Sequence, residues 1–219
     1  MPTVTCVDKA NVLRSFAFFR KVFDEVAGRY PDVAADHLYV DAAALELVRR
    51  PERFDVMVTE NLLGDILSDL AAGLIGGMGV APSADLGDHH AVFQPCHGTA
   101  PDLAGRGLAN PVAAILSCAM LLDHLGRTKH DDAPARAARK IESAVALALA
   151  DGRFRTADIG GPASTKEVTS AIPAKSRFAN GRRTISLTGG VSLRQVPRSP
   201  WPARRPNPPV SSEWRGRFP

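Results

Sequence analysis

Short apolar segments that read as strands alternate along this chain with longer segments in which apolar residues recur at helical spacing. Because parallel strands are joined by crossover connections, usually helices, this alternation predicts an α/β fold with a largely parallel sheet flanked by helices. The expected strands are 3–7, 37–40, 54–59 and 91–94, and the expected helices run from 11 to Gly28, 42–50, 61–74, 111–125, 134–150 and 164–172.

Charge and composition divide the chain near Ala174. Of the 27 Lys and Arg and 23 Asp and Glu residues, 174–219 holds ten basic residues and one acid, which leaves 17 basic and 22 acidic residues before it. The same segment has seven of the 17 prolines, a composition typical of disordered segments. This basic, proline-rich tail either binds nucleic acid or another anionic surface, or comes from a shifted reading frame or rearrangement; we favour the second reading.

The apolar runs, the N-terminus and the cysteines indicate the cellular compartment in which the protein works. No apolar run approaches the roughly 18 residues of a membrane span, and the N-terminus lacks the basic start and apolar stretch of a secretory signal. Cys6, Cys96 and Cys118 are odd in number and far apart, which argues against a disulfide scaffold or a cysteine zinc site. We expect a cytoplasmic protein with no membrane partner and, because residues before Ala174 are mildly acidic, no nucleic-acid partner.

Three aspartates form the first candidate constellation. Asp41 follows a predicted strand, and Asp65 and Asp69 lie four residues apart in NLLGDILSDL, on one face of a predicted helix. Like charges at this spacing repel, and a hard cation such as Mg²⁺ or Mn²⁺ would relieve the repulsion. Taken alone, the pattern is more typical of a solvated helix face that carries acids near its start.

A lysine and a loop supply two further candidates. Lys9 directly follows a predicted strand, where a lysine with a lowered pKa can act as a general base; the alternative is an ordinary surface lysine. Residues 97–111 (HGTAPDLAGRGLANP) combine Gly98 with small residues, which lets backbone N–H groups approach phosphates, and Asp102 can bind a ribose diol. Alone, this segment also fits an ordinary surface loop.

Four phrases occur together in one order: VDKANVL, YVDAAAL, FDVMVTENLLGDILSDLAAGLIGGMG and FQPCHGTAPDLAGRGLANP. Their content and order resemble the isocitrate/isopropylmalate dehydrogenase family of β-decarboxylating dehydrogenases, most closely its isopropylmalate and homoisocitrate members. The resemblance runs from Thr3 to Ile172, and DIGGPASTKEVTSAI is similar to the family's last helix region.

The resemblance implies a partial isopropylmalate-dehydrogenase-like fold in three parts: a dimerisation and substrate part at 1–82, a cofactor part at 83–173, and the tail at 174–219. It implies that Lys9 is catalytic and that Asp41, Asp65 and Asp69 bind Mg²⁺ or Mn²⁺. The residues that match the family's NAD-binding positions are His97, Gly98, Thr99, Ala100, Pro101, Asp102 and Asn110.

The implied reaction is NAD-dependent oxidative decarboxylation of a 2-hydroxy acid with a β-carboxylate, such as 3-isopropylmalate, homoisocitrate or isocitrate; these phrases do not select one. In the family, the counterparts of Lys9 and Asp41 reach the neighbouring subunit's site, which implies a homodimer. Family members also carry a long region ahead of the match. We therefore expect the chain to resemble a C-terminal half that is inactive alone, or a non-catalytic partner subunit of a full-length paralogue.

Overall fold

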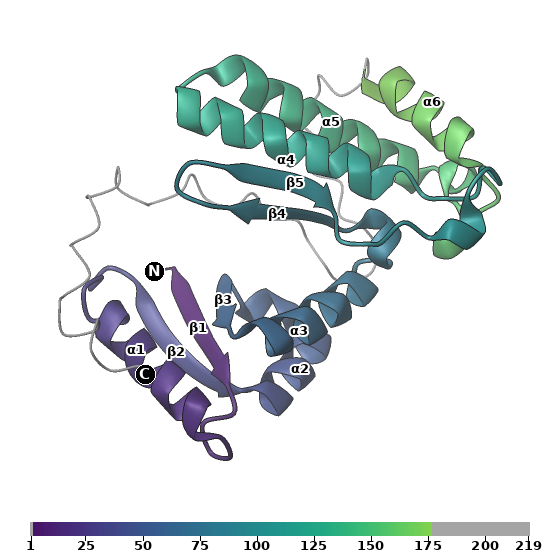
Figure 1. Ribbon diagram of the computed structural model, residues 1–219. Helices are drawn as coiled ribbons and strands as arrows, with labels where there is room; N and C mark the ends of the chain where they lie inside the picture. Colours follow the sequence, from purple (N-terminus) through teal and green to yellow (C-terminus); the bar gives the residue numbers. More distant parts are fainter. Residues whose placement is uncertain (1, 177–219) are drawn as a thin grey trace.

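The computed structural model describes residues 2–176, which form two groups of elements (Figure 1). The first is built on a three-stranded sheet of β1 (Thr3–Asp8), β2 (Ala34–Tyr39) and β3 (Val56–Thr59). The strand order is β2-β1-β3, and both pairings are parallel. The α/β class with a parallel sheet flanked by helices is therefore confirmed.

Helices cover both faces of this sheet (Figure 1). α1 (Arg14–Ala27) packs against β1 on one face, while α2 (Val40–Arg49) and α3 (Asn61–Leu74) pack together on the other. The core on the α2 and α3 side contains Val7, Ala43, Leu47 and Leu67.

The central strand β1 is buried from Thr5 to Asp8, as expected for a parallel strand with a neighbour on each side and helices on each face. Because side chains alternate along a strand, Val7 faces α2 and α3 whereas Cys6 and Asp8 face α1. A charged residue therefore ends the most buried strand.

The second group joins a hairpin to a helical layer (Figure 1). β4 (Pro82–Leu86) and β5 (Ala91–Pro95) pair antiparallel, α4 (Val112–Lys129) packs on them and along α5 (Asp132–Ala150), and α6 (Thr165–Ser176) packs on α5. The buried core of this group is Val80, Val112, Ala144, Val145, Ala148, Ala163, Val168 and Ile172. Short 3-10 helices occur at Pro51–Arg53, Met78–Val80, Pro101–Leu103, Gly152–Phe154 and Ala157–Ile159.

Beyond shifts of a few residues at element ends, the structure differs from the sequence expectations mainly in three places. β4 was not predicted, because its pattern begins at a proline and follows a glycine run. α4 continues past Gly126 to Lys129, and it is capped by His130, whose φ of 54° lies in the left-handed region. α6 extends through Pro173 to Ser176, so the tail predicted at 174–219 is helical over its first three residues, and the rest of it, from 177 onward, lies outside the described residues. Among residues 2–176, no helix is long and apolar enough to cross a membrane.

Gly126 does not end its helix because it is a packing position. A Cβ added there would lie 2.9 Å from the Ala135 Cβ and 3.0 Å from the Asp131 carbonyl oxygen. The absence of a side chain therefore lets the start of α5 approach α4 closely.

We expect Gly126→Ala to lower the free energy of unfolding by about 1–3 kcal/mol, since the added methyl overpacks the α4–α5 contact. Gly73→Ala is the matched control, because nothing lies within 4 Å of its added Cβ. That control should stabilise the protein by about 0.5–1 kcal/mol through helix propensity. Urea unfolding of both variants measures the difference, and stabilisation by both would contradict the packing role.

Candidate functional site

Three predicted site segments meet at one edge of the parallel sheet. Lys9 directly follows β1, and β2 runs without a loop into α2, whose first turn carries Asp41. β3 ends at Thr59, and α3 begins two residues later. Because β1, β2 and β3 are parallel, their carboxyl ends lie together, where open α/β sheets bind ligands.

Lys9 and Asp41 form an ion pair at this edge, between Lys9 Nζ and Asp41 Oδ1. The Lys9 side chain is 29% exposed and that of Asp41 is 68% exposed. The hydrogen bond from Lys9 is the largest cause that lowers the pKa of Asp41 below its ordinary value. Lys9 is thus a partnered lysine directed at a predicted metal ligand, rather than a solitary surface lysine.

Behind this pair, the Asp8 carboxylate is completely buried. Arg20 on α1 donates to both carboxylate oxygens, each at 2.7 Å. The Ala10 backbone N–H donates to Oδ1 at 2.9 Å, and the Cys6 thiol lies 3.7 Å from Oδ2. The carboxylate therefore receives donors from its own strand, from the connection that carries Lys9, and from α1.

These contacts decide the ionisation of the two buried groups. Burial alone would raise the pKa of Asp8, but the hydrogen bonds from Arg20 and Ala10 and the charge of Arg20 outweigh it, so the pKa is lowered. Burial first, and the Asp8 charge second, raise the pKa of the Cys6 thiol to about 12. The Asp8 site therefore holds a carboxylate, and Cys6 remains a neutral thiol.

Two cations lie over the Tyr39 ring. The Arg20 guanidinium carbon lies 5.1 Å and the Lys9 Nζ lies 5.8 Å from the ring centroid. Tyr39 is also the register partner of Asp8 across the β1–β2 pair. Neither Arg20 nor Tyr39 was predicted as a site residue. An arginine among the phenylalanines of α1 is the sequence signal that points to Arg20.

Asp65 and Asp69 lie one turn apart on α3, and both are exposed. Within residues 2–176, no group of three or more His, Cys, Asp and Glu side chains is placed to hold a metal ion. One chain therefore does not gather Asp41, Asp65 and Asp69 into a metal centre. Their chemistry still fits a hard divalent cation, since all three present carboxylate oxygens to solvent.

The predicted cofactor residues form an exposed loop after β5. The His97 Nδ1 lies 2.9 Å from the Gly98 carbonyl oxygen, and Asp102 lies exposed in the 3-10 turn Pro101–Leu103. Ala100 has φ 43° and ψ 62°, a left-handed conformation that costs a non-glycine residue roughly 1–3 kcal/mol. Backbone strain of this kind concentrates at ligand-binding segments.

The end of this loop is tied to distant parts of the chain. Thr165, at the start of α6, donates its backbone N–H to the Gly107 carbonyl at 2.8 Å and its hydroxyl to the Ala109 carbonyl. The side-chain Oδ1 of Asn110 accepts from the Val112 N–H at 3.0 Å, and the side-chain Nδ2 donates to Asp158 Oδ2 at 3.0 Å. The loop is therefore held at its Asn110 end, while residues 97–102 project into solvent.

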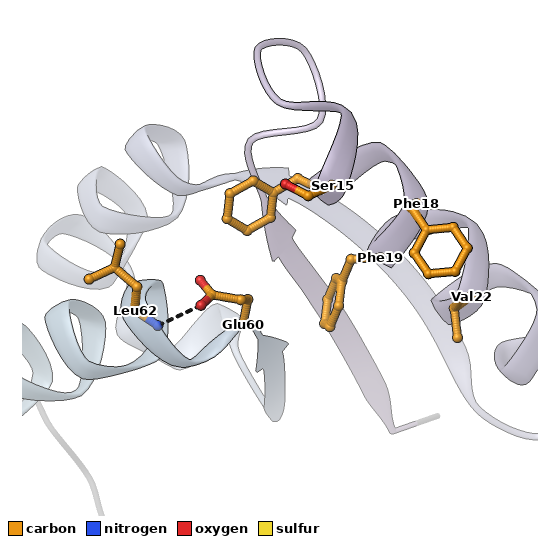
Figure 2. Close-up of a pocket in the computed structure, with 7 residues that line it drawn as sticks. Ser15, Phe18, Phe19, Val22, Glu60 and Leu62 are labelled. Carbon is orange, nitrogen blue, oxygen red and sulfur yellow. Dashed lines mark hydrogen bonds between the residues drawn. The ribbon is translucent and has the colours of Figure 1, made fainter. Parts of the chain in front are cut away.

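A cavity of about 560 Å³ lies between α1 and the start of α3 (Figure 2). Glu60 is the charged residue that lines it, and its carboxylate accepts from the Leu62 N–H at 3.0 Å. None of the predicted site residues lines this cavity, whose surface suits apolar groups rather than a small polycarboxylate. Its lining residues are Ser15, Phe16, Phe18, Phe19, Val22, Glu60 and Leu62.

Comparison with known proteins gives consistent matches. The protein-family model for isocitrate/isopropylmalate dehydrogenase matches residues 1–172. The chain is 53% identical over 171 residues to an isocitrate/homoisocitrate dehydrogenase of Thermus thermophilus, covering 78% of this chain and 49% of that protein. It is 52% identical over 167 residues to a 3-isopropylmalate dehydrogenase of Xanthomonas campestris, covering 76% and 45% respectively.

A solved structure agrees with these matches. The crystal structure of isocitrate dehydrogenase from Methylococcus capsulatus superposes with a TM-score of 0.74 at 45% sequence identity. The superposition covers 80% of this chain and 51% of that one. The chain thus spans about half the length of the curated relatives it matches.

The Asp8 ion pair predicts how stability depends on pH. Since the folded-state pKa of Asp8 is lowered, its stabilisation is present above the unfolded value near pH 4 and is lost as pH falls through the folded pKa. We expect Asp8→Asn to lower the free energy of unfolding at pH 7 by about 3 kcal/mol and to lessen its decline in acid. Urea unfolding at pH 7 and in acid tests this, with Asp85→Asn as the exposed control. Equal acid sensitivity of Asp8→Asn and wild type would refute it.

Proposed function

Because the chain belongs to the isocitrate/isopropylmalate dehydrogenase family, we propose that it serves the NAD-dependent oxidative decarboxylation of a 2-hydroxy acid with a β-carboxylate. The substrate class is isopropylmalate-like, homoisocitrate-like or isocitrate-like, after the names of its relatives. One observation carries the proposal: the Lys9–Asp41 pair lies at the carboxyl edge of a parallel sheet from which α3 also begins.

In this proposal Lys9, as the neutral amine freed from its ion pair, accepts the proton of the substrate hydroxyl. Hydride passes from the carbon that bears this hydroxyl to the nicotinamide, and the β-carboxylate then leaves as CO₂. Asp41, Asp65 and Asp69 would hold Mg²⁺ or Mn²⁺, which when bound polarises the substrate's hydroxyl and carboxylate oxygens. A metal on Asp41 would compete with Lys9 for that carboxylate, since Oδ1 is engaged in the ion pair. Lys9 would then be released towards substrate.

For the cofactor, we propose that residues 83–173 bind NAD through the loop after β5. Asp102 is exposed, so its carboxylate can accept hydrogen bonds from the two hydroxyls of the adenosine ribose. His97, Gly98, Thr99, Ala100 and Pro101 would line the dinucleotide. The side chain of Asn110 is already engaged at both ends, so its contact with adenine would use backbone atoms.

We further propose that a second subunit completes the site. On α2, Asp41, Leu45 and Val48 follow helical spacing along one face, and Leu45 and Val48 are 53% and 56% exposed. On α3, Leu62, Ile66 and Asp69 are spaced in the same way, and Leu62 and Ile66 are 63% and 57% exposed. The carboxylates therefore share a helix face with exposed apolar residues that a partner would cover.

The partner is a second copy of this chain or a full-length relative. In the second case the chain is a non-catalytic subunit that supplies Lys9 and Asp41 to its partner's site, and it turns over no substrate alone. Three unpaired cysteines, two of them exposed, favour a reducing compartment such as the cytoplasm for either assembly.

Rescue in trans tests the role of Lys9. The Thermus thermophilus relative, inactivated at its counterpart of Lys9, is mixed with this chain, and NADH formation is followed with isocitrate or homoisocitrate and Mg²⁺. We expect the wild-type chain to restore activity and Lys9→Met to fail, since methionine has no amine to accept the proton. Lys21→Met, on exposed α1, should rescue like wild type. A co-purifying complex that stays silent with the wild-type chain would rule out this role.

The subunit interface makes a separate prediction. We expect Ile66→Glu to weaken self-association at least tenfold, since a charge would be buried in an apolar contact. Leu86→Glu, at an equally exposed leucine on β4, is the control and should leave association unchanged. Sedimentation velocity over a concentration series measures both variants. A wild-type chain that remains a monomer at all concentrations would contradict a homodimer, and capture by a full-length relative would then identify the heterodimer.

A further inference from the structure

We propose that Arg20 is a positioning residue for the Lys9–Asp41 pair, and that it acts through Asp8 on one side and Tyr39 on the other. What the pair does in catalysis rests on the proposed function, but the positioning itself is a property of the folded chain. Among the described residues Arg20 forms a hydrogen bond or ion pair with neither member of the pair, so its effect is transmitted through Asp8 and Tyr39.

The first chain of contacts leads from Arg20 through Asp8 to the backbone of Lys9. Asp8 is held by Arg20 through two hydrogen bonds and holds the Ala10 N–H in turn. The Lys9 carbonyl accepts from the N–H groups of Val12 and Leu13, at 2.9 and 3.0 Å. The lysine backbone is therefore fixed on both sides, by the buried carboxylate before it and by the turn that enters α1.

The second chain of contacts leads from Arg20 through Tyr39 to Asp41. The Arg20 guanidinium lies over the Tyr39 ring, and the ring lies beneath the Lys9 ammonium. Tyr39 ends β2 and is separated from Asp41 by one residue, so the orientation of the ring and the start of α2 are coupled. One guanidinium thus contacts Asp8, which directly precedes Lys9, and Tyr39, which lies two residues before Asp41.

The pair needs such support. An ion pair between a flexible lysine and a carboxylate that is 68% exposed is weak and poorly ordered by itself. Support from buried partners is what fixes the geometry of a functional site. Here the buried partner is the Asp8–Arg20 unit, with Asp8 fully buried and the Arg20 side chain 27% exposed.

The chain offers a direct probe, because it contains two tyrosines, Tyr30 and Tyr39. We would label the full chain with 3-fluorotyrosine and record its two ¹⁹F resonances without metal. Arg20→Gln should shift the Tyr39 resonance and leave that of Tyr30, beyond the end of α1, in place. Lys21→Gln, the neighbouring exposed cation, should move neither.

A double-mutant cycle separates positioning from independent packing effects. Lys9→Met should shift the Tyr39 resonance in wild type, because the ammonium lies over the ring. In Arg20→Gln the same change should have less than half that effect, because the ring no longer keeps its place beneath Lys9. Additive shifts would mean that Arg20 does not position the pair and would overturn the proposal.

Titration with Mn²⁺ then tests the connection to the proposed metal site. Bound Mn²⁺ should broaden the Tyr39 resonance of wild type selectively, and Arg20→Gln should weaken this binding about tenfold. If wild type shows no broadening while the double-mutant cycle is non-additive, the metal proposal fails and the positioning proposal stands. Selective broadening together with an additive cycle would support the metal site and overturn the positioning role of Arg20.

A second variant keeps the proposal testable if Arg20→Gln, which leaves the buried Asp8 carboxylate unpaired, does not fold. Breaking a buried ion pair at one partner is strongly destabilising, whereas replacing both partners by apolar residues is often tolerated. Asp8→Leu combined with Arg20→Met should retain the wild-type circular dichroism yet show the Arg20→Gln behaviour of Tyr39. A folded double variant with a wild-type Tyr39 resonance and an undiminished Lys9→Met shift would overturn the proposal.

Discussion

A buried carboxylate must be partnered, and in this chain that requirement falls on Asp8 at the end of the central strand. The partner, Arg20, comes from α1, so α1 has to pack against the end of β1 where the functional residues begin. The same side chain lies on Tyr39 at the end of β2. The need to pair the buried Asp8 carboxylate therefore fixes the position of α1, the ends of β1 and β2, and the connection that carries Lys9.

An apolar pair would fill the same space without the desolvation of two charges, so stability alone is a poor reason for this ion pair. What a carboxylate adds is directional bonding. Asp8 accepts from the Ala10 backbone and from Arg20 at defined angles, which no leucine does. The fold thus places its most demanding buried group one residue before the lysine whose position matters most.

The elements of the fold followed from the sequence wherever local pattern was sufficient. Strand and helix periodicity located β1, α1, α3 and α5. It also predicted that Asp41 directly follows a strand, and β2 indeed runs into α2 without a loop. Contacts between distant segments were not visible. Gly126 read as a helix end because nothing local shows that α5 packs there, and Ala100 gave no sign of a left-handed backbone that glycine usually adopts.

The candidate site divides in the same way. Lys9, Asp41, Asp65 and Asp69 were found because family phrases surround them, whereas spacing alone left each of them open to an ordinary surface role. Arg20 was missed, since its importance lies in a carboxylate twelve residues earlier that only the folded chain buries. Thr165, which ties down the cofactor loop, lies 56 residues beyond its partner Ala109.

Exposed apolar side chains that a second subunit would cover lie on the same helix faces as the proposed metal ligands. Asp41 shares a face of α2 with Leu45 and Val48, and Asp69 shares a face of α3 with Ile66. Within residues 2–176 the acids do not form a metal cluster, and the apolar residues beside them are uncovered. A partner that covers these faces to bury their apolar groups must also approach the carboxylates. If the proposed function is assumed, burial of these apolar residues between subunits also brings the metal ligands together. Neither the apolar interface nor the metal site is complete in one chain.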